Sequence, residues 1–162
     1  MDREYYMAKA LDLAREAAED GEVPVGCIIL DKDNNIVGRG RNRREKCSDA
    51  TAHAEIEAIR EACSKLGDWR LDECSIYVTL EPCPMCAGAI INSRIRNVYV
   101  GAPDPKNGAM GSVVSLQDNF THKPNVVNGI MKDECAAVLS DFFKDLRERK
   151  RNSFYGEPGT NK

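Results

Sequence analysis

The chain has 162 residues, of which 42% are hydrophobic and 30% charged, and its formal net charge is −3. A chain of this length has the usual size of one domain and buries roughly 70% of its unfolded surface. The acidic balance argues against a protein that binds nucleic acid through bulk positive charge, and the longest apolar runs are much shorter than the ~20 residues that span a bilayer. We therefore expect a soluble protein without a membrane segment.

Seven cysteines are present, but their number is odd and their spacing is scattered. Residues 1–4 lack the basic-then-apolar pattern of a signal peptide. These features favour reduced thiols, so we expect a cytoplasmic protein.

Hydrophobic periodicity and turn residues predict the following elements in chain order: a helix over 2–19, antiparallel strands over 23–30 and 36–40, a helix from a cap at 49 or 51 to about 65, a strand over 75–80, a helix over 84–92, strands over 97–101 and 126–130, and a helix over 132–151. The expected apolar stripe of the first helix contains Ala8, Leu11, Ala14 or Arg15, and Ala18.

Strands that alternate with helices predict an α/β fold in which a mixed sheet carries helices on both faces. No internal repeat or linker divides the chain. We expect a single domain over 1–151 and a flexible tail over 152–162, where glycine and proline are frequent.

Two basic clusters interrupt the acidic background. Residues 39–46 hold five basic side chains and one acidic one, and residues 144–151 hold five basic and two acidic. Such clusters are either solvated faces or contacts for phosphate groups.

Two short motifs carry the chemistry. His53-Ala54-Glu55 and Pro82-Cys83-Pro84-Met85-Cys86 supply three zinc-ligand side chains and one spare carboxylate. A catalytic zinc keeps three protein ligands and leaves a fourth position to water, whereas a structural zinc has four. We expect His53, Cys83 and Cys86 to bind one Zn²⁺, with His53 in the first turn of a helix and both cysteines at the start of the next, where thiolate is favoured.

Each motif alone has another interpretation. A lone C-x-x-C is also a redox motif or half of a structural zinc site, and a lone His-x-Glu has little meaning. The other cysteines lack partners at short spacing, and we interpret them as core or surface residues. His122 is interpreted as a surface residue of a loop.

Together the motifs resemble the H-x-E and P-C-x-x-C signature of zinc-dependent nucleobase deaminases. This resemblance implies hydrolytic deamination, in which zinc lowers the pKa of a water molecule from about 15.7 to about 7. Glu55 would accept a proton from this water and deliver it to the ring nitrogen and the departing amine.

The flanking segments narrow the family. The chain from about Tyr5 to Lys144 resembles the bacterial tRNA-specific adenosine deaminases through six segments, at 22–26, 40–43, 51–56, 79–89, 101–112 and 133–137. The glycine-rich segment Gly101–Ser112 is unlike that of free-nucleoside deaminases. The resemblance implies a three-layer α/β/α cytidine-deaminase-like fold with a mixed five-stranded sheet, one Zn²⁺ per subunit and a homodimer. It also implies conversion of adenosine to inosine at the wobble position of a tRNA anticodon.

The family also implies residue roles. Asn42 should hydrogen-bond the flipped nucleotide, because an amide both donates and accepts, and Asp104 should lie near the RNA backbone. The implied substrate- and RNA-binding residues are Asn42, Ala54, Asp104, Arg41, Arg43, Arg44, Lys106, Phe142, Phe143 and Arg147. The alternatives are a turn residue for Asn42, a turn initiator for Asp104 and core packing for at least one phenylalanine. Pro103 stands where an Arg is expected, which puts one phosphate contact in question.

Two other functions compete. A guanine or other free-base deaminase would share the zinc site without needing RNA contacts. A non-catalytic RNA-binding or zinc-structured module would use Glu55 only as a helix-capping acid.

Overall fold

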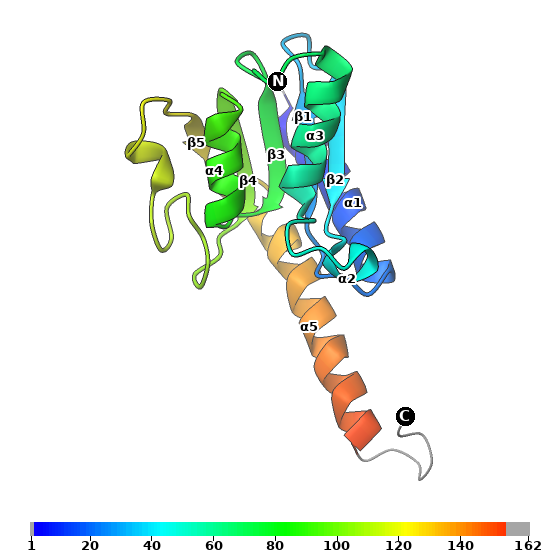
Figure 1. Cartoon of the computed structure of the whole chain (residues 1–162). Coiled ribbons are helices and arrows are strands. Elements are labelled where there is room, and N and C mark those ends of the chain that lie inside the picture. Colours follow the sequence, from blue (N-terminus) through cyan, green and yellow to red (C-terminus); the bar gives the residue numbers. More distant parts are fainter. Residues whose placement is uncertain (1, 155–162) are drawn as a thin grey trace.

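The computed structural model describes residues 2–154 (Figure 1). Its elements are α1 (Arg3–Glu19), β1 (Gly26–Leu30), β2 (Ile36–Arg41), α2 (Arg44–Cys47), α3 (Ala54–Leu66), β3 (Ser75–Leu80), α4 (Pro84–Asn92), β4 (Asn97–Ala102), the 3₁₀ helix η1 (Leu116–Asp118), β5 (Asn125–Val127) and α5 (Lys132–Phe154).

The five strands form one mixed sheet in the order β2-β1-β3-β4-β5. β1 runs antiparallel to both β2 and β3, and β3, β4 and β5 run parallel. Parallel neighbours require crossovers, which α4 provides between β3 and β4. The predicted mixed five-stranded sheet with helices on both faces is confirmed.

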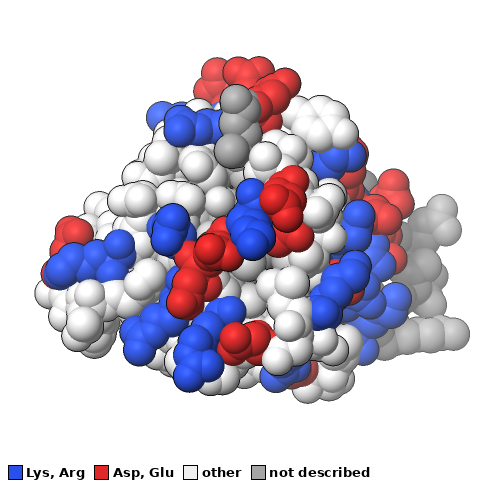
Figure 2. Space-filling model, turned by 90° about the horizontal axis from the view of Figure 1, so that it is seen from above, with Lys and Arg blue, Asp and Glu red and all other residues white. Residues whose placement is uncertain are grey.

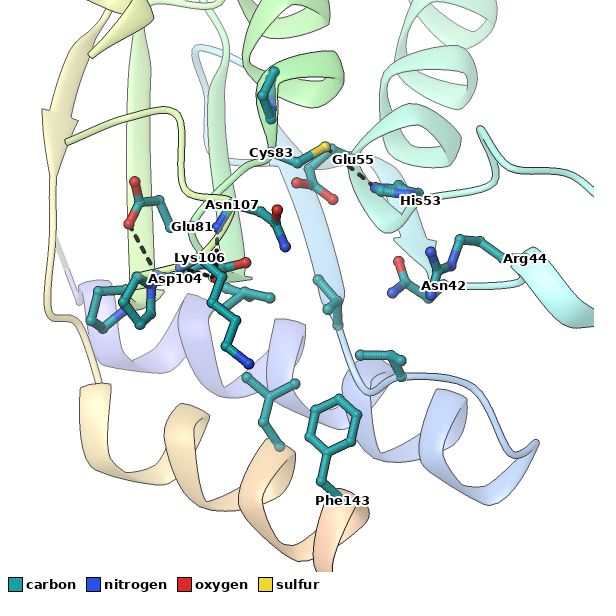
Figure 3. Close-up of a pocket in the computed structure, with 17 residues that line it drawn as sticks. Asn42, Arg44, His53, Glu55, Glu81, Cys83, Asp104, Lys106, Asn107 and Phe143 are labelled. Carbon is teal, nitrogen blue, oxygen red and sulfur yellow. Dashed lines mark hydrogen bonds between the residues drawn. The ribbon is translucent and has the colours of Figure 1, made fainter. Parts of the chain in front are cut away.

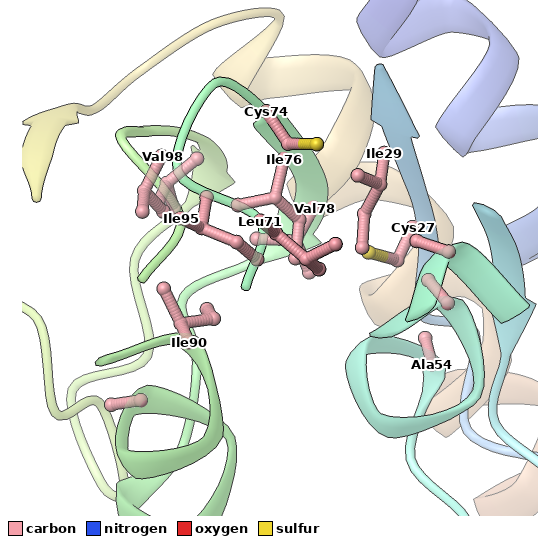
Figure 4. Close-up of a cluster of buried hydrophobic side chains, with 14 of the residues drawn as sticks. Cys27, Ile29, Ala54, Leu71, Cys74, Ile76, Val78, Ile90, Ile95 and Val98 are labelled. Atoms are coloured by element: carbon pink, nitrogen blue, oxygen red, sulfur yellow. The ribbon is translucent and has the colours of Figure 1, made fainter. Parts of the chain in front are cut away.

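Alternating residues of the strands build a separate core on each face of the sheet. One core joins Ile29, Val78 and other strand residues to the small side chains of α3 and to α4 (Figure 4). The other joins Ile28 and Tyr77 to α1 and to Cys135 of α5. Successive side chains of a strand point to opposite faces of the sheet. Because helices cover both faces, nearly every side chain of β1, β3 and β4 is buried, and their sequences are mostly apolar without alternation.

α1 buries Leu11 and Ala14 as predicted, but its other buried residues differ from the predicted stripe. Its buried residues are Met7, Ala10, Leu11, Ala14 and Ala17. Arg15 is exposed, and Ala8 and Ala18 are only half-buried. Gly26 allows the helix to approach β1 closely, because a Cβ there would collide with the Ala10 carbonyl oxygen.

Other differences concern element ends. The short helix α2 was not predicted. β5 (Asn125–Val127) begins one residue before the strand expected over 126–130 and ends three residues before it does. α5 continues to Phe154, so residues 152–154 of the predicted tail are helical. The rest of that tail, 155–162, lies outside the described residues.

α3 lies directly on the backbone of β2. A Cβ at Gly38 would collide with the Ala58 carbonyl oxygen, and one at Gly40 would collide with the Ala54 carbonyl oxygen. The absence of a Cβ at the two glycines thus sets the distance between α3 and β2. The contact at Ala54 is next to the predicted metal ligand His53.

We expect Gly40→Ala to lower the free energy of unfolding by about 3 kcal/mol, because backbone atoms must move to admit the new methyl group. Urea denaturation measures the change. Gly88→Ala is the matched control, since nothing lies within 4 Å of a Cβ there. It should stabilise α4 by about 0.5–1 kcal/mol through helix propensity. Equal stabilities of the two variants would contradict the close-packing argument.

Seen from above, the molecule presents the end that carries the β1–β2 turn, opposite α2. Lys and Arg side chains are interspersed there with Asp and Glu, without an extended face of one sign (Figure 2). Across residues 2–154, no helix combines the length and apolarity needed to cross a membrane.

Candidate active site

A cavity of about 650 Å³ opens where β3 and β4 end. Parallel strands place their carboxyl ends at one edge of the sheet, which is where α/β proteins build their sites. The lining residues are Val23, Val25, Asn42, Arg44, His53, Glu55, Leu80, Glu81, Cys83, Pro84, Pro103, Asp104, Pro105, Lys106, Asn107, Leu139 and Phe143 (Figure 3).

The three predicted zinc ligands meet at the edge of this cavity. The Nδ1 atom of His53 lies 3.6 Å from Cys83 Sγ and 3.5 Å from Cys86 Sγ. A tetrahedral zinc with ordinary Zn–N and Zn–S bond lengths separates a nitrogen from a sulfur ligand by about 3.6 Å. The ligand atoms of all three residues lie within 4.8 Å of one another. These residues therefore fit one zinc ion, and the two-sulfur, one-nitrogen set favours this metal.

Two helix N-termini converge on the ligands. His53 is the N-cap of α3, so the prediction that it lies in the first turn is wrong by one position. Cys83 is the N-cap of α4, and neither residue makes a side-chain capping bond. A hydrogen bond with Cys86 lowers the pKa of Cys83 to about 4. Cys83 is thereby prepared to bind a metal as thiolate.

Glu55 follows the ligand His53 by two residues and is 3% exposed. His53 has extended backbone and Glu55 is helical, so both side chains reach the same space without sharing a helical stripe. Burial raises the pKa of the Glu55 carboxyl to about 7. A carboxyl that titrates near neutrality both accepts and releases a proton, as a proton carrier must.

Asn42 orders the start of α3. Its side-chain oxygen accepts a hydrogen bond from the Ala54 backbone N–H at 3.0 Å, and the residue is 6% exposed. This bond supplies the helix cap that His53 does not provide. Because this bond occupies the side-chain oxygen, the side-chain NH₂ group of Asn42 is left as a hydrogen-bond donor in the cavity.

The segment after β4 forms the opposite wall. Asp104 Oδ1 accepts hydrogen bonds from the backbone N–H groups of Lys106 and Asn107 at 3.0 and 3.1 Å. This is the turn-initiating geometry that sequence reasoning kept as the alternative for Asp104. Asp104 and Lys106 nevertheless both line the cavity.

The basic cluster at 39–46 is largely folded back on the protein. Arg41 forms an ion pair with Asp20 at 3.2 Å, and Arg43 Nε lies 3.2 Å from Glu57. We expected both guanidinium groups to face solvent and contact RNA phosphates, but each is instead paired with a carboxylate of the protein. Arg44, by contrast, is exposed and lines the cavity.

α5 closes the cavity from below in Figure 3. Phe143 points toward it and is 39% exposed. Phe142 and Arg147 are absent from the lining. Arg147 follows Phe143 by one helical turn and is exposed, so the two side chains share a face of α5.

The other candidate ligands lie elsewhere. His122 lies in a loop, apart from the three zinc-ligand residues, as predicted. It is half-buried, and its Nε2 lies 2.7 Å from the Ile95 carbonyl oxygen. Cys27, Cys74 and Cys135 are buried, as expected for core residues.

Sequence reasoning missed two buried carboxylates that hold the walls of the cavity. Glu22 accepts hydrogen bonds from the backbone N–H groups of Glu45 and Lys46 at 3.2 and 2.8 Å, and so caps α2. Glu81 accepts bonds from the segment after β4. The sequence offered one sign of these two residues. Each is the single acidic residue of an otherwise apolar or proline-containing segment at the end of a strand or before one, Glu22 in 22–26 and Glu81 in 79–89.

Residues 1–102 match the family described as the cytidine and deoxycytidylate deaminase zinc-binding region. The tRNA-specific adenosine deaminase of Bacillus subtilis is 45% identical over 150 residues, which cover 91% of this chain and 92% of that protein. The protein of the same name from Haemophilus influenzae is 45% identical over 91% of this chain and 87% of its own length.

Comparison with solved structures supports the same family. One from a study of A-to-I editing by tRNA:A34 deaminases at the wobble position has a TM-score of 0.81 and 46% identity, and the match covers 85% of this chain and all of that chain. Guanine deaminase from Nitrosomonas europaea has a TM-score of 0.77 at 25% identity, covering 87% of this chain and 84% of that one. The chain therefore belongs to the cytidine and deoxycytidylate deaminase family, among the tRNA-specific adenosine deaminases.

Proposed function

We propose that this protein converts adenosine to inosine at the wobble position of a tRNA anticodon by hydrolytic deamination, consuming water and releasing ammonia. The observation that carries the proposal is that Glu55 and the zinc-ligand residues His53 and Cys83 line the same cavity as Asn42 and Lys106, with Cys86 buried directly behind them. Metal, proton carrier and polar contacts for a base are thus within one site.

His53, Cys83 and Cys86 would hold the zinc ion, which would lower the pKa of a water molecule from about 15.7 to about 7. Glu55 would accept a proton from this water and transfer it to N1 of the purine as the water oxygen bonds to C6. Glu55 would then take the proton of the new C6 hydroxyl and deliver it to the exocyclic nitrogen, so that the C6–N bond breaks, ammonia leaves and the C6 carbonyl of inosine forms. Its burial keeps competing water away from the carboxyl.

The cavity walls support an RNA substrate. Arg44 comes from one wall and Lys106 from the other, so positive side chains flank the opening (Figure 3). Phe143 lies at the mouth, where an aromatic ring offers a stacking surface to an unpaired base. An anticodon loop is already single-stranded, so extrusion of its adenosine costs little. Arg147 extends the same face of α5 toward the stem. A tRNA substrate also agrees with a cytoplasmic location.

The test compares an anticodon stem-loop RNA carrying adenosine at the wobble position with free adenosine and free guanine. We expect inosine in the RNA only, and none with Glu55→Ala. Turnover of guanine with unreacted RNA would overturn the tRNA assignment and support the free-base deaminase. Full activity of Glu55→Ala would overturn the catalytic role of Glu55.

Asn42 is predicted to donate its amide N–H to the flipped base. Asn42→Asp keeps an acceptor for the Ala54 N–H, where a helix N-terminus favours negative charge, but removes the donor. We expect kcat/KM for the RNA to fall by roughly 10- to 100-fold with little change in thermal stability. Asn42→Ala should lower both. Undiminished kcat/KM in Asn42→Asp would show that Asn42 only caps α3.

We also propose a homodimer. Large exposed apolar side chains gather on α4 and on the segment between β4 and β5, which packs on α4 through η1: Met85, Val113, Val114 and Phe120. Sedimentation velocity should give twice the chain mass of 18.0 kDa. The double substitution Val113→Asp and Val114→Asp should give monomers, whereas Trp69→Asp, also at an exposed apolar residue, should stay dimeric. A monomeric wild type would refute the proposal.

A further inference from the structure

The wall of the cavity formed by residues 103–112 is held by one buried side chain. Glu81 is 4% exposed. Its Oε1 accepts a hydrogen bond from the Asp104 N–H at 3.1 Å, and its Oε2 accepts bonds from the N–H groups of Met110 and Ser112, each at 3.0 Å. The Ser112 hydroxyl donates a further bond to Oε1. One carboxylate thus gathers both ends of the segment.

The segment closes over this carboxylate because position 108 is a glycine. A Cβ at Gly108 would collide with the Glu81 carboxylate and would lie 2.5 Å from the Asp104 carbonyl oxygen. The same carboxylate therefore fixes the path of the backbone between Asp104 and Ser112, including the residues Lys106 and Asn107 that face the cavity.

Glu81 is also joined to the metal-binding turn. It stands two residues before Cys83, and its own N–H donates to the Ala102 carbonyl oxygen at 2.9 Å. The Ala109 N–H donates to the Pro82 carbonyl oxygen, also at 2.9 Å. The cavity wall and the segment that carries the metal ligands are consequently held as one unit, with the carboxylate at their junction.

We propose that Glu81 is a positioning residue that sets the 103–112 wall relative to the zinc ligands and so determines how tightly the RNA substrate is held. This inference rests on the proposed function, since the wall is taken to contact RNA. The carboxylate accepts hydrogen bonds from backbone N–H groups of the wall, and it acts through them. A carboxylate offers acceptors only, which is what a ring of N–H and O–H donors requires.

Glu81→Gln tests the proposal because it keeps the size of the side chain but turns an NH₂ group toward N–H donors. We expect KM for the stem-loop RNA to rise by about tenfold and kcat to stay within about threefold, since buried donors lose their acceptor while the proton carrier is untouched. Zinc content should remain one per chain. Ser112→Ala, which removes only the hydroxyl bond, should raise KM less.

Amide hydrogen exchange supplies a readout that does not depend on activity. Glu81→Gln should speed exchange of the amides at 104, 110 and 112 and leave α2 unchanged. Glu22→Gln is the matched control, a buried carboxylate on the opposite wall, and it should speed exchange at 45 and 46 instead.

Unchanged exchange at 104–112 in Glu81→Gln would overturn the proposal, as would faster exchange throughout the chain with loss of zinc, which indicates a general structural role. A wild type that leaves RNA unreacted would overturn the proposed function, and the exchange pattern would then decide the role of Glu81 by itself.

Discussion

Glu55→Gln is expected to lower kcat for the anticodon RNA by roughly 10³- to 10⁴-fold, the range that a positioned acid–base group contributes. The substitution keeps the shape of the side chain and removes its ability to accept a proton. KM should change little, because the Glu55 carboxylate does its work after the base is bound. Single-turnover measurement of inosine formation gives the rate constant of the chemical step without product release, and it should fall by the same factor.

Glu61→Gln is the matched control, since Glu61 lies exposed on the same helix and its carboxylate accepts only the Arg39 N–H at 3.0 Å, a bond that glutamine preserves. Its kcat should equal that of the wild type. A loss of less than tenfold in Glu55→Gln would assign the proton transfers to another group.

Cys86→Ala should abolish zinc binding and reduce activity by more than about 10³-fold, because two remaining ligands do not hold a catalytic zinc. Zinc content measured by mass spectrometry should fall from one per chain to near zero. Thermal stability should fall as well, since metal that binds only the folded state stabilises it.

Cys27→Ala separates loss of metal from loss of packing. Cys27 is as fully buried as Cys86 but lies in the core on β1 and does not belong to the group of His53, Cys83 and Cys86. This variant should lose about 1 kcal/mol of stability through the cavity left behind and keep its zinc. Retention of zinc by Cys86→Ala would remove Cys86 from the ligand set.

The chemical centre was predictable from sequence because its parts are local. His53 with Glu55, and Cys83 with Cys86, are each joined by short spacing, and the helix ends beside them follow from proline and periodicity. The alternation of strands and helices likewise predicted the sheet. Sequence patterns of this kind report contacts between near neighbours in the chain.

The walls of the site were less predictable because they depend on distant partners. Arg41 and Arg43 belong to a basic cluster, but carboxylates on α1 and α3 neutralise them. Glu22 and Glu81 each bind backbone 23 or more residues away, which no local pattern reveals. The stripe of α1 was only partly predicted, because residues on either side of Leu11 and Ala14 fit a helical spacing equally well, and only contact with the sheet selects Met7, Ala10 and Ala17.

The backbone contact between α3 and β2 has a consequence for how this protein tolerates change. At Gly38 and Gly40 the helix meets the strand through carbonyl oxygens, so the spacing between the two elements does not depend on the exact volumes of neighbouring core side chains. Aliphatic residues in that core are thus free to drift among similar types over evolution while His53 keeps its place. The two glycines, by contrast, should be conserved among related proteins.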